Sequence, residues 1–463
     1  MFFESFLLNL LILLILILAL LFDYVTKYFS YWYIRHIPNK TPIPCFGTDY
    51  HRIIGFRSTS QEVDTLYKQY SEKFVGCIKS RIPDLIVKDP DVVRKILSTD
   101  FLNFHSRGLG LDKSRDVCLR NNLFYVEGEK WTLLRDTLET LLNNMKFETQ
   151  EGLHDCLSGI NGDTNIEQLL CMILDIVFKD LLIGNDVEEC IITHLRQRAI
   201  KRSFKDKAKT YLKNIFPSLF VLFNLESSLT TECLKVRNIN ETKLYKGFKK
   251  AKSISQLDSK SIKVRAENEI ELGVLSLFIT EGYIPCYNVL TALLYELAKH
   301  PEIQERARNN ENNLNLAIKE TLRLYSPYAN ITRKCIGRYL ASKDLLIDKG
   351  VMITIPTSSM QKDETLFNDP ESFKPERFEK TDAVDGFYPF GMGPKKCVGK
   401  SVTYSIRCKL FPYTINLANI TKDRHFIRHL IQAVALKMRV SAVTWPLAPL
   451  QTFYDYLITI LEP

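Results

Sequence analysis

The hydrophobic pattern is most extreme at the start of the chain. From Ser5 to Phe22 almost every residue is Leu, Ile, Phe or Ala. A helix of this length rises about 1.5 Å per residue and spans roughly 27 Å, which is near the hydrocarbon thickness of a bilayer. A cleaved signal peptide would have a basic start and small residues at its end, whereas Glu4 precedes this run and Asp23 comes after it. The pattern predicts an uncleaved transmembrane anchor.

The residues after the anchor predict its orientation. Lys27, Arg35 and Lys40 come after the apolar run and no basic residue precedes it, so the positive-inside rule places the rest of the chain in the cytosol. Three prolines between residues 37 and 44 then predict a stiff, non-helical connector. The rest of the sequence has no internal linker or repeat. The expected organisation is an anchor (1–24), a basic and Pro-rich connector (25–44) and one large domain (45–463).

A helical pattern with a pair of opposite charges lies in the last third of the chain. Apolar positions from Leu314 to Tyr325 recur on one helical face, and Pro327 ends the helix. Glu320 and Arg323 stand at i and i+3, so their side chains point the same way. A Glu-x-x-Arg pair taken alone is commonly a solvated surface pair.

Composition narrows the function classes. The chain has 463 residues, of which 46% are hydrophobic and 25% charged, and this is typical of a globular protein. The net charge of +9 suits an acidic protein partner or anionic lipid, while the scattered Lys and Arg residues argue against nucleic-acid binding. None of the eleven cysteines forms a C-x-x-C pair, which disfavours a zinc site or a disulfide framework.

One cysteine stands in a loop with unusual composition. Between Phe387 and Gly399, three glycines and two prolines surround Cys397. Glycines permit positive φ and close approach to a planar ligand, and the amides of such a loop can donate to a thiolate. The residues after Gly399 can open a helix whose dipole favours the anion. The alternative is a Gly-rich turn around a buried thiol.

The loop Phe390-Gly391-x-Gly393-x-x-x-Cys397-x-Gly399 resembles the haem-binding loop of the cytochrome P450 family. In that family the cysteine thiolate is the axial ligand of the iron of haem b. The resemblance covers roughly residues 38–440. It implies a mainly α fold with a small β-rich region (α+β), preceded here by the transmembrane helix, with Phe390 and Cys397 at the cofactor.

Further motifs occur in family order and imply contacts with the haem propionates. Trp131 and Arg135 share one helical face at i and i+4, and both can donate to a carboxylate. Arg333 stands where many relatives keep another propionate-binding arginine, with a solvated surface arginine as the alternative. Lys395 occupies the place where the family usually has arginine, which replaces a bidentate contact by a point charge.

The segment from Phe373 to Phe378 completes the set of structural motifs. In the family it supplies an arginine that joins the Glu–Arg helix. Carried over, Glu320, Arg323 and Arg377 form a buried, charge-paired cluster with a structural role, because buried charges must be paired.

The oxygen-activation segment departs from the family pattern. A long central helix is expected from Glu269 to His300, where relatives usually read small–Gly–x–acid–Thr. This chain reads Glu281-Gly282-Tyr283-Ile284-Pro285. Gly282 is kept, but neither Ile284 nor Pro285 can donate a proton. The proline should also kink or open the helix.

Three functions remain open on this sequence. The first is a haem-thiolate monooxygenase with Cys397, Gly282 and Glu281 as catalytic candidates and protons from Glu281, Tyr283, water or the substrate. The second is an isomerase or dehydratase that acts on a peroxide without O₂. The third is a non-catalytic haem-binding protein that acts as a sensor or carrier.

The resemblance also implies partners and a location. Microsomal relatives receive electrons from NADPH–cytochrome P450 reductase, with cytochrome b5 as a second candidate, and Lys395, Lys396 and Lys400 are expected to face the acidic reductase. The apolar segment from residue 211 to 225 is either core or a surface that dips into the lipid bilayer. We expect a single-pass protein of the endoplasmic reticulum membrane that takes an apolar small-molecule substrate.

Overall fold

The computed structural model describes residues 2–402 apart from 44–45, 49, 56, 80–81, 145–165, 185–190, 237–240, 251–267, 343–344 and 381–383. The chain divides into two compact units. One comprises Met1–Ser106 and Asn330–Pro356, and the other comprises Arg107–Ala329 and the described part of Thr357–Val443. The chain therefore passes from one unit to the other more than once, and each is described here by itself.

The first unit begins with the long helix α1 (Phe2–Tyr33). Its window Phe6–Asp23 has a mean hydropathy of 2.9 and is not buried at all. The helix continues beyond the predicted anchor to a buried tryptophan. The indole N–H of Trp32 donates to the carbonyl oxygen of Cys77 at 2.8 Å, and its ring lies so close to Gly76 that a β-carbon there would approach it to 2.5 Å. The end of α1 is thereby fixed to the sheet of the same unit.

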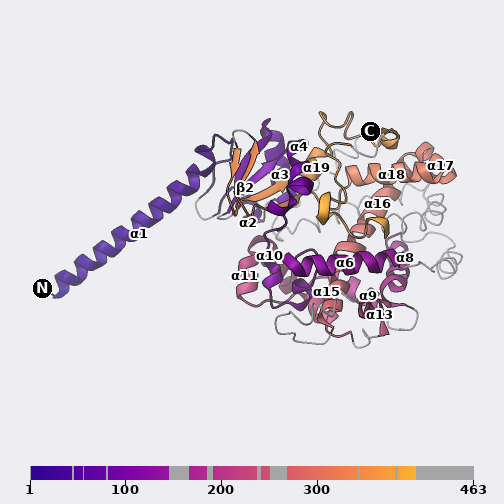
Figure 1. Cartoon of the computed structure of the whole chain (residues 1–463), viewed down its shortest axis with the longest axis horizontal. Helices are drawn as coiled ribbons and strands as arrows, with labels where there is room; N and C mark the ends of the chain where they lie inside the picture. Colours follow the sequence, from indigo (N-terminus) through magenta and orange to yellow (C-terminus); the bar gives the residue numbers. More distant parts are fainter. Residues whose placement is uncertain are drawn as a thin grey trace. The chain divides into compact units, whose positions relative to one another are not determined.

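That sheet is small and mixed. Its strands are arranged in the order β1 (Phe74–Lys79), β2 (Ile82–Val87), β6 (Met352–Ile355) and β3 (Ile331–Lys334). The middle pair is parallel and the outer pairs are antiparallel. A two-stranded ribbon of β4 (Tyr339–Ser342) and β5 (Leu345–Ile347) accompanies it. Figure 1 shows β2 beside α3 (Thr59–Gln69), with α2 (Tyr50–Ile54) and α4 (Pro90–Arg94) nearby.

The second unit is helical in its described residues. Its longer helices are α6 (Gly128–Asn144), α8 (Ile166–Phe178), α9 (Ile191–Ile200), α10 (Phe204–Ile215), α13 (Lys243–Lys250), α15 (Glu269–Leu277), α16 (Ile284–Lys299), α17 (Pro301–Asn309) and α18 (Glu311–Leu324). The shorter ones are α5 (Val117–Arg120), α11 (Pro217–Leu222), α12 (Ser228–Cys233) and α19 (Thr357–Met360).

Two apolar clusters form the core of the second unit. The larger gathers side chains of α6, α8, α9, α15 and α16, which lie together in Figure 1. The smaller joins α16 to α17 and α18. The amphipathic helix predicted from Leu314 to Tyr325 is confirmed as α18, whose first turn is capped by the Asn310 side chain. The predicted fold class, mainly helical with a small β-rich region behind an apolar helix, is also confirmed.

The predicted central helix is present but interrupted. It consists of α15, a π-helical segment η6 (Phe278–Tyr283) and α16. Pro285 stands in the first turn of α16. The N–H groups of a first helical turn have no partner within the helix, so the N–H that proline lacks costs no hydrogen bond there. The amide of Ile284 instead donates to the carbonyl of Ile279, five residues back. The expected opening of the helix at the proline is therefore a π-turn immediately before it.

Candidate active site

The cysteine loop places Cys397 at an exposed position. Gly391 and Gly393 have φ of +69° and +68°, a conformation that side-chain-bearing residues rarely adopt. The amide of Cys397 donates to the carbonyl oxygen of Phe390 at 2.8 Å, which closes the loop. Cys397 is exposed, whereas the other six cysteines in the described part of the chain are buried. The interpretation as a buried thiol in a glycine-rich turn therefore does not hold.

The segment after the loop is described as far as Val402. Residues 400–402 are helical, and a β-carbon at Gly399 would lie 4.0 Å from the sulfur of Cys397. The continuation of the expected helix, together with Cys45, Cys156, Cys190 and Cys408, lies outside the described residues. The start of a helix directly after the sulfur agrees with the expected dipole effect on a thiolate.

Two residues of helix α6 that were predicted to bind the haem propionates contact the cysteine loop. The Arg135 guanidinium donates to the carbonyl oxygen of Lys396 at 2.8 Å and pairs with Glu139. The ammonium of Lys395 lies 4.8 Å from the centroid of the Trp131 ring, and that lysine is only 7% exposed. The structure thus brings Trp131, Arg135 and Lys395 to one side of the loop.

The other two predicted cofactor residues have different surroundings. Arg333 lies on β3 in the first unit and is only 1% exposed, so it is not a solvated surface arginine. Its guanidinium donates to the carbonyl oxygen of Thr332 at 2.8 Å. Phe390 packs partly buried against the α16–α18 cluster and holds Cys397 through its backbone. A shared ligand for Arg333 and the α6 residues stays a prediction.

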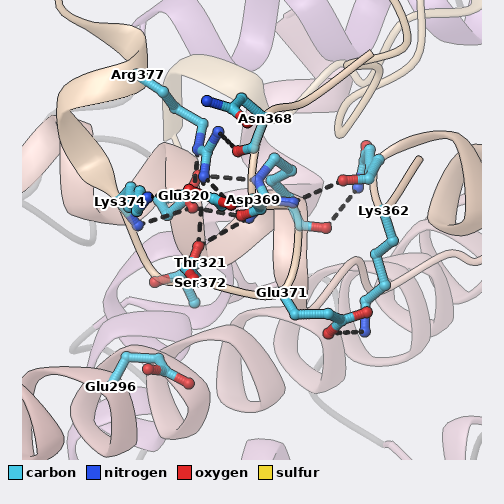
Figure 2. Close-up of polar contacts among 12 residues, drawn as sticks. Glu296, Glu320, Thr321, Lys362, Asn368, Asp369, Glu371, Ser372, Lys374 and Arg377 are labelled. Atoms are coloured by element: carbon cyan, nitrogen blue, oxygen red, sulfur yellow. Dashed lines mark hydrogen bonds and ion pairs between the residues drawn. The ribbon is translucent and has the colours of Figure 1, made fainter. Parts of the chain in front are cut away.

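The Glu–Arg helix carries a largely buried ion-pair cluster (Figure 2). Glu320 and Arg323 are both 0% exposed, and their bidentate contacts measure 2.9 and 2.8 Å. Figure 2 shows Arg377 reaching toward the same carboxylate, with Nε 3.1 Å from Oε1. The amide of Lys374 also donates to Oε1, at 3.0 Å. The structure brings the three predicted residues together, and the single carboxylate compensates two guanidinium groups.

Backbone carbonyls satisfy the remaining donors of this cluster. Arg323 donates to the carbonyl of Gln361 at 2.7 Å, and Arg377 donates to that of Asn368 at 2.8 Å. Glu296 lies apart in Figure 2 and accepts instead from the phenol of Tyr325. The segment from residue 361 to 378 is therefore fastened to α18, and it leads toward the cysteine loop.

Of the catalytic candidates on the π-turn, Glu281 has a defined polar partner. The phenol of Tyr328 donates to its Oε2. Burial raises the pKa of the Glu281 carboxyl, while the Tyr328 hydrogen bond and the charges of Lys213 and Arg107 oppose that rise. Gly282 has a packing role, because a β-carbon there would come within 3.3 Å of the Phe178 ring.

Tyr283 is a poor source of protons for this site. It is fully buried, and its phenol donates to the Asp175 carboxylate at 2.7 Å, with the Cys171 carbonyl oxygen 3.0 Å from the same phenol oxygen. Arg196 completes that group with contacts of 3.0 and 3.1 Å to Asp175. Burial, which has the largest effect, and the Asp175 charge raise the pKa of Tyr283. The expectation that Tyr283 supplies protons is therefore not supported, since the π-turn directs it toward α8.

Arg107 is a residue that the sequence reasoning missed. Its guanidinium lies over the Phe124 ring, with 3.8 Å between Cζ and the ring centroid, and within the described residues its buried Nε has no hydrogen-bond partner. Burial lowers the pKa of Arg107, while the negative charges of Glu281 and Cys397 oppose this. A buried guanidinium with a donor to spare fits an anionic ligand, so the donor set suits a haem with its carboxylates.

No sequence motif pointed to Tyr328 or Lys213 either. Tyr328 comes directly after Pro327, which ends the Glu–Arg helix, and it reaches Glu281 across 47 positions of the chain. Lys213 lies on α10, in a segment that the sequence marked only as apolar. Contacts over such distances result from helix packing and leave no periodic signal.

Comparisons with known proteins agree with this geometry. The family model described as Cytochrome P450 matches residues 266–405, which include the central helix, α18 and the cysteine loop. The chain is 26% identical over 431 residues to cytochrome P450 6l1 of Blattella germanica, covering 83% of this chain and 85% of that protein. It is 26% identical over 442 residues to cytochrome P450 3A5 of Homo sapiens, covering 82% and 85%. Cytochrome P450 6a2 of Drosophila melanogaster is 27% identical over 455 residues, covering 84% and 88%.

The ion-pair cluster generates the first prediction. Glu320→Gln should lower the free energy of unfolding by about 3 kcal/mol, because the fully buried Arg323 guanidinium and the partly exposed one of Arg377 lose their compensating charge. Urea unfolding of the purified protein measures this. Glu376→Gln, at an exposed glutamate beside Arg377, is the matched control and should change stability by less than about 0.5 kcal/mol. Equal effects of the two substitutions would contradict the structural role of Glu320.

Proposed function

Because this chain belongs to the cytochrome P450 family and is an oxidoreductase of that family, we propose that it inserts one oxygen atom from O₂ into an apolar organic substrate. The observation that carries the proposal is the exposed sulfur of Cys397, held in a loop with two left-handed glycines and braced by α6. A loop of this form offers a thiolate to a metal centre from one side.

Haem b, when bound, would supply the iron at which O₂ is used, and a thiolate ligand suits that chemistry. On this proposal Cys397 would bind the iron, and Trp131, Arg135, Arg333 and Lys395 would hold the propionates. The contact between Lys395 and the Trp131 ring supports the assignment on α6. The buried Nε of Arg107, which has no partner among the described residues, supports adding that residue to the set.

The balanced reaction takes substrate RH, O₂, NADPH and one proton to ROH, water and NADP⁺. The polypeptide must therefore enclose the substrate, keep bulk water out and pass protons into the site. Buried apolar side chains of α15 and α16 provide the dry surroundings. The π-turn η6 between those helices carries the acidic side chain nearest to the family's proton-delivery position.

One observation favours a second candidate, an isomerase or dehydratase that rearranges a peroxide without O₂ or a reductase. Ile284 and Pro285 stand where relatives have an acid and an alcohol, and a peroxide rearrangement needs no protons from that pair. The two functions differ in their dependence on NADPH and O₂.

We also propose NADPH–cytochrome P450 reductase as the electron donor, with cytochrome b5 as a second partner. Lys396 and Lys400 are exposed beside the cysteine loop and suit an acidic docking face. Lys395, which was expected to join them, is buried against Trp131 and does not contribute to that surface. The expected docking surface is therefore reduced to two lysines.

For location, we propose a single-pass protein of the endoplasmic reticulum membrane with its catalytic part in the cytosol. The exposed apolar window of α1 supports the anchor. The segment 211–225 was expected either to pack in the core or to enter the bilayer, and it contains both buried and exposed apolar side chains. Phe220 is 1% exposed and packs with Leu111 and Leu119, whereas Leu222 and Phe223 are 69% and 62% exposed at the end of α11.

The monooxygenase proposal predicts the requirements for turnover. Full-length protein in lipid vesicles, assayed against a panel of sterols, fatty acids and xenobiotics, should form product only with NADPH, reductase and O₂. Isotopically labelled O₂ should place one labelled atom in the product. Product from an added hydroperoxide without NADPH or O₂ would instead establish the isomerase or dehydratase.

The same turnover assay tests whether Lys396 and Lys400 bind the reductase. Lys396→Glu with Lys400→Glu should raise the reductase concentration needed for half-maximal turnover about 10-fold at low salt, since rim charges act mainly on association. Lys349→Glu, an exposed lysine of the first unit, is the control and should have little effect.

The exposed end of α11 predicts a second membrane contact. In a form that lacks residues 2–22, Leu222→Ser with Phe223→Ser should weaken vesicle binding about 10-fold, because two apolar side chains leave the lipid. Flotation with vesicles measures this. Leu102→Ser, at a leucine that is 79% exposed in the first unit, is the control. Equal partitioning of both forms would show that α11 does not enter the bilayer.

A further inference from the structure

We propose that Glu281 is the residue that donates protons in this site, and that Tyr328 positions its carboxyl group. The carboxyl and the phenol would replace the acid–alcohol pair that is absent at Ile284 and Pro285. This inference rests on the proposed monooxygenase function and names the residues that complete it. Glu281 is the catalytic residue of the pair, and Tyr328 acts through it.

Both the side chain and the backbone of Tyr328 are held by contacts within the fold. Its phenol donates to Oε2 of Glu281, and its ring stacks on Phe124 with 6.2 Å between centroids and an interplanar angle of 24°. Its carbonyl oxygen accepts from the hydroxyls of Ser326 at 2.9 Å and Thr357 at 3.0 Å. The phenol is therefore held in place before any ligand binds, as a positioning group must be.

Thr280 lies beside Glu281 on the same π-turn, and its hydroxyl donates to the carbonyl of Ser276 at 2.9 Å. Because that single hydroxyl proton is used on Ser276, the phenol of Tyr328 is the hydroxyl group that donates to the Glu281 carboxylate.

The charges around Glu281 suit a group that both holds and releases a proton. Burial raises its pKa, and a hydrogen bond from Tyr328 and nearby cations limit the rise. The groups that face it are Tyr328, the guanidinium of Arg107 and the ammonium of Lys213, with the phenol of Tyr125 also within electrostatic reach. Burial therefore favours the protonated carboxyl and its partners favour the carboxylate, so the surroundings stabilise both forms that a general acid passes through.

The proton step balances within the polypeptide and solvent. The carboxyl O–H bond of Glu281 breaks, and its proton would pass to the oxygen atom of O₂ that leaves as water. The carboxylate that remains keeps the Tyr328 hydrogen bond and the favourable field of Lys213. A proton from solvent water then restores the acid. Tyr283 does not compete in this role, because its phenol is committed to Asp175.

A test that does not depend on turnover monitors the carboxyl itself. In the full-length holoenzyme, the infrared band of a protonated carboxyl should titrate with pH and be absent from Glu281→Gln. In Tyr328→Phe the band should persist to higher pH, because the phenol no longer stabilises the carboxylate and the pKa of Glu281 rises further. Tyr295→Phe, at a tyrosine of α16 that contacts Lys299, should leave the titration unchanged.

Turnover gives the second readout. Product formation should fall as pH rises through the pKa of Glu281, and Tyr328→Phe should move that limb to higher pH. Glu281→Gln should lower product formed per NADPH consumed by about 100-fold and release hydrogen peroxide, since general acids contribute on that scale. Glu281→Asp should recover part of the loss.

Failure of this inference differs from failure of the proposed function. If Glu281→Gln loses no infrared band, or Tyr328→Phe leaves the titration where it was, the inference is overturned even though NADPH-dependent product forms. If no NADPH- and O₂-dependent product forms in the wild type, the monooxygenase proposal fails, and the infrared titration still reports whether the carboxyl–phenol pair exists.

Discussion

The candidate site depends on one constraint, namely that Cys397 must be held at an exposed position by a loop whose own backbone fixes its shape. Two glycines at positive φ give the loop its shape, and the Phe390 carbonyl fixes the amide of Cys397. The contact of Arg135 with the Lys396 carbonyl holds the same loop from α6. These interactions fix the loop through mostly backbone atoms around an exposed Cys397.

The buried charges of α18 also help to place the cysteine loop, because they bind the segment that precedes it. Glu320 binds two guanidinium groups and a backbone amide, and the arginines in turn bind the carbonyls of the segment that precedes the cysteine loop. An arrangement of this kind is costly to desolvate and adds little net stability, but it permits one geometry of the segment. Its value here is the placement of the chain ahead of Cys397.

Local patterns predicted the parts of the molecule that depend on neighbouring residues. The helical period gave α18, the apolar run gave α1, and the proline predicted the opened turn in the central helix. The grouping of Glu320, Arg323 and Arg377 came from the family resemblance rather than from spacing, because Glu-x-x-Arg alone is commonly a surface pair. Motif spacing carries this information only when several motifs occur together.

Features that depend on packing between distant segments were not predictable. The burial of Lys395 against Trp131 and the burial of Phe220 in the core both depend on which helix face turns inward. The contact between Tyr328 and Glu281 joins the turn after α18 to a π-turn, and no period in the sequence describes a π-turn. The site therefore departs from the sequence-based expectation at the position where the family pattern breaks.

The most direct measurement of the central claim is the absorption spectrum of the reduced protein with carbon monoxide, for the wild type and Cys397→Ala. Ligation of iron by the Cys397 thiolate predicts the long-wavelength haem band that gives the family its name, and its loss in the variant. A wild-type protein that carries no porphyrin, or a spectrum that is the same in both proteins, would contradict the account.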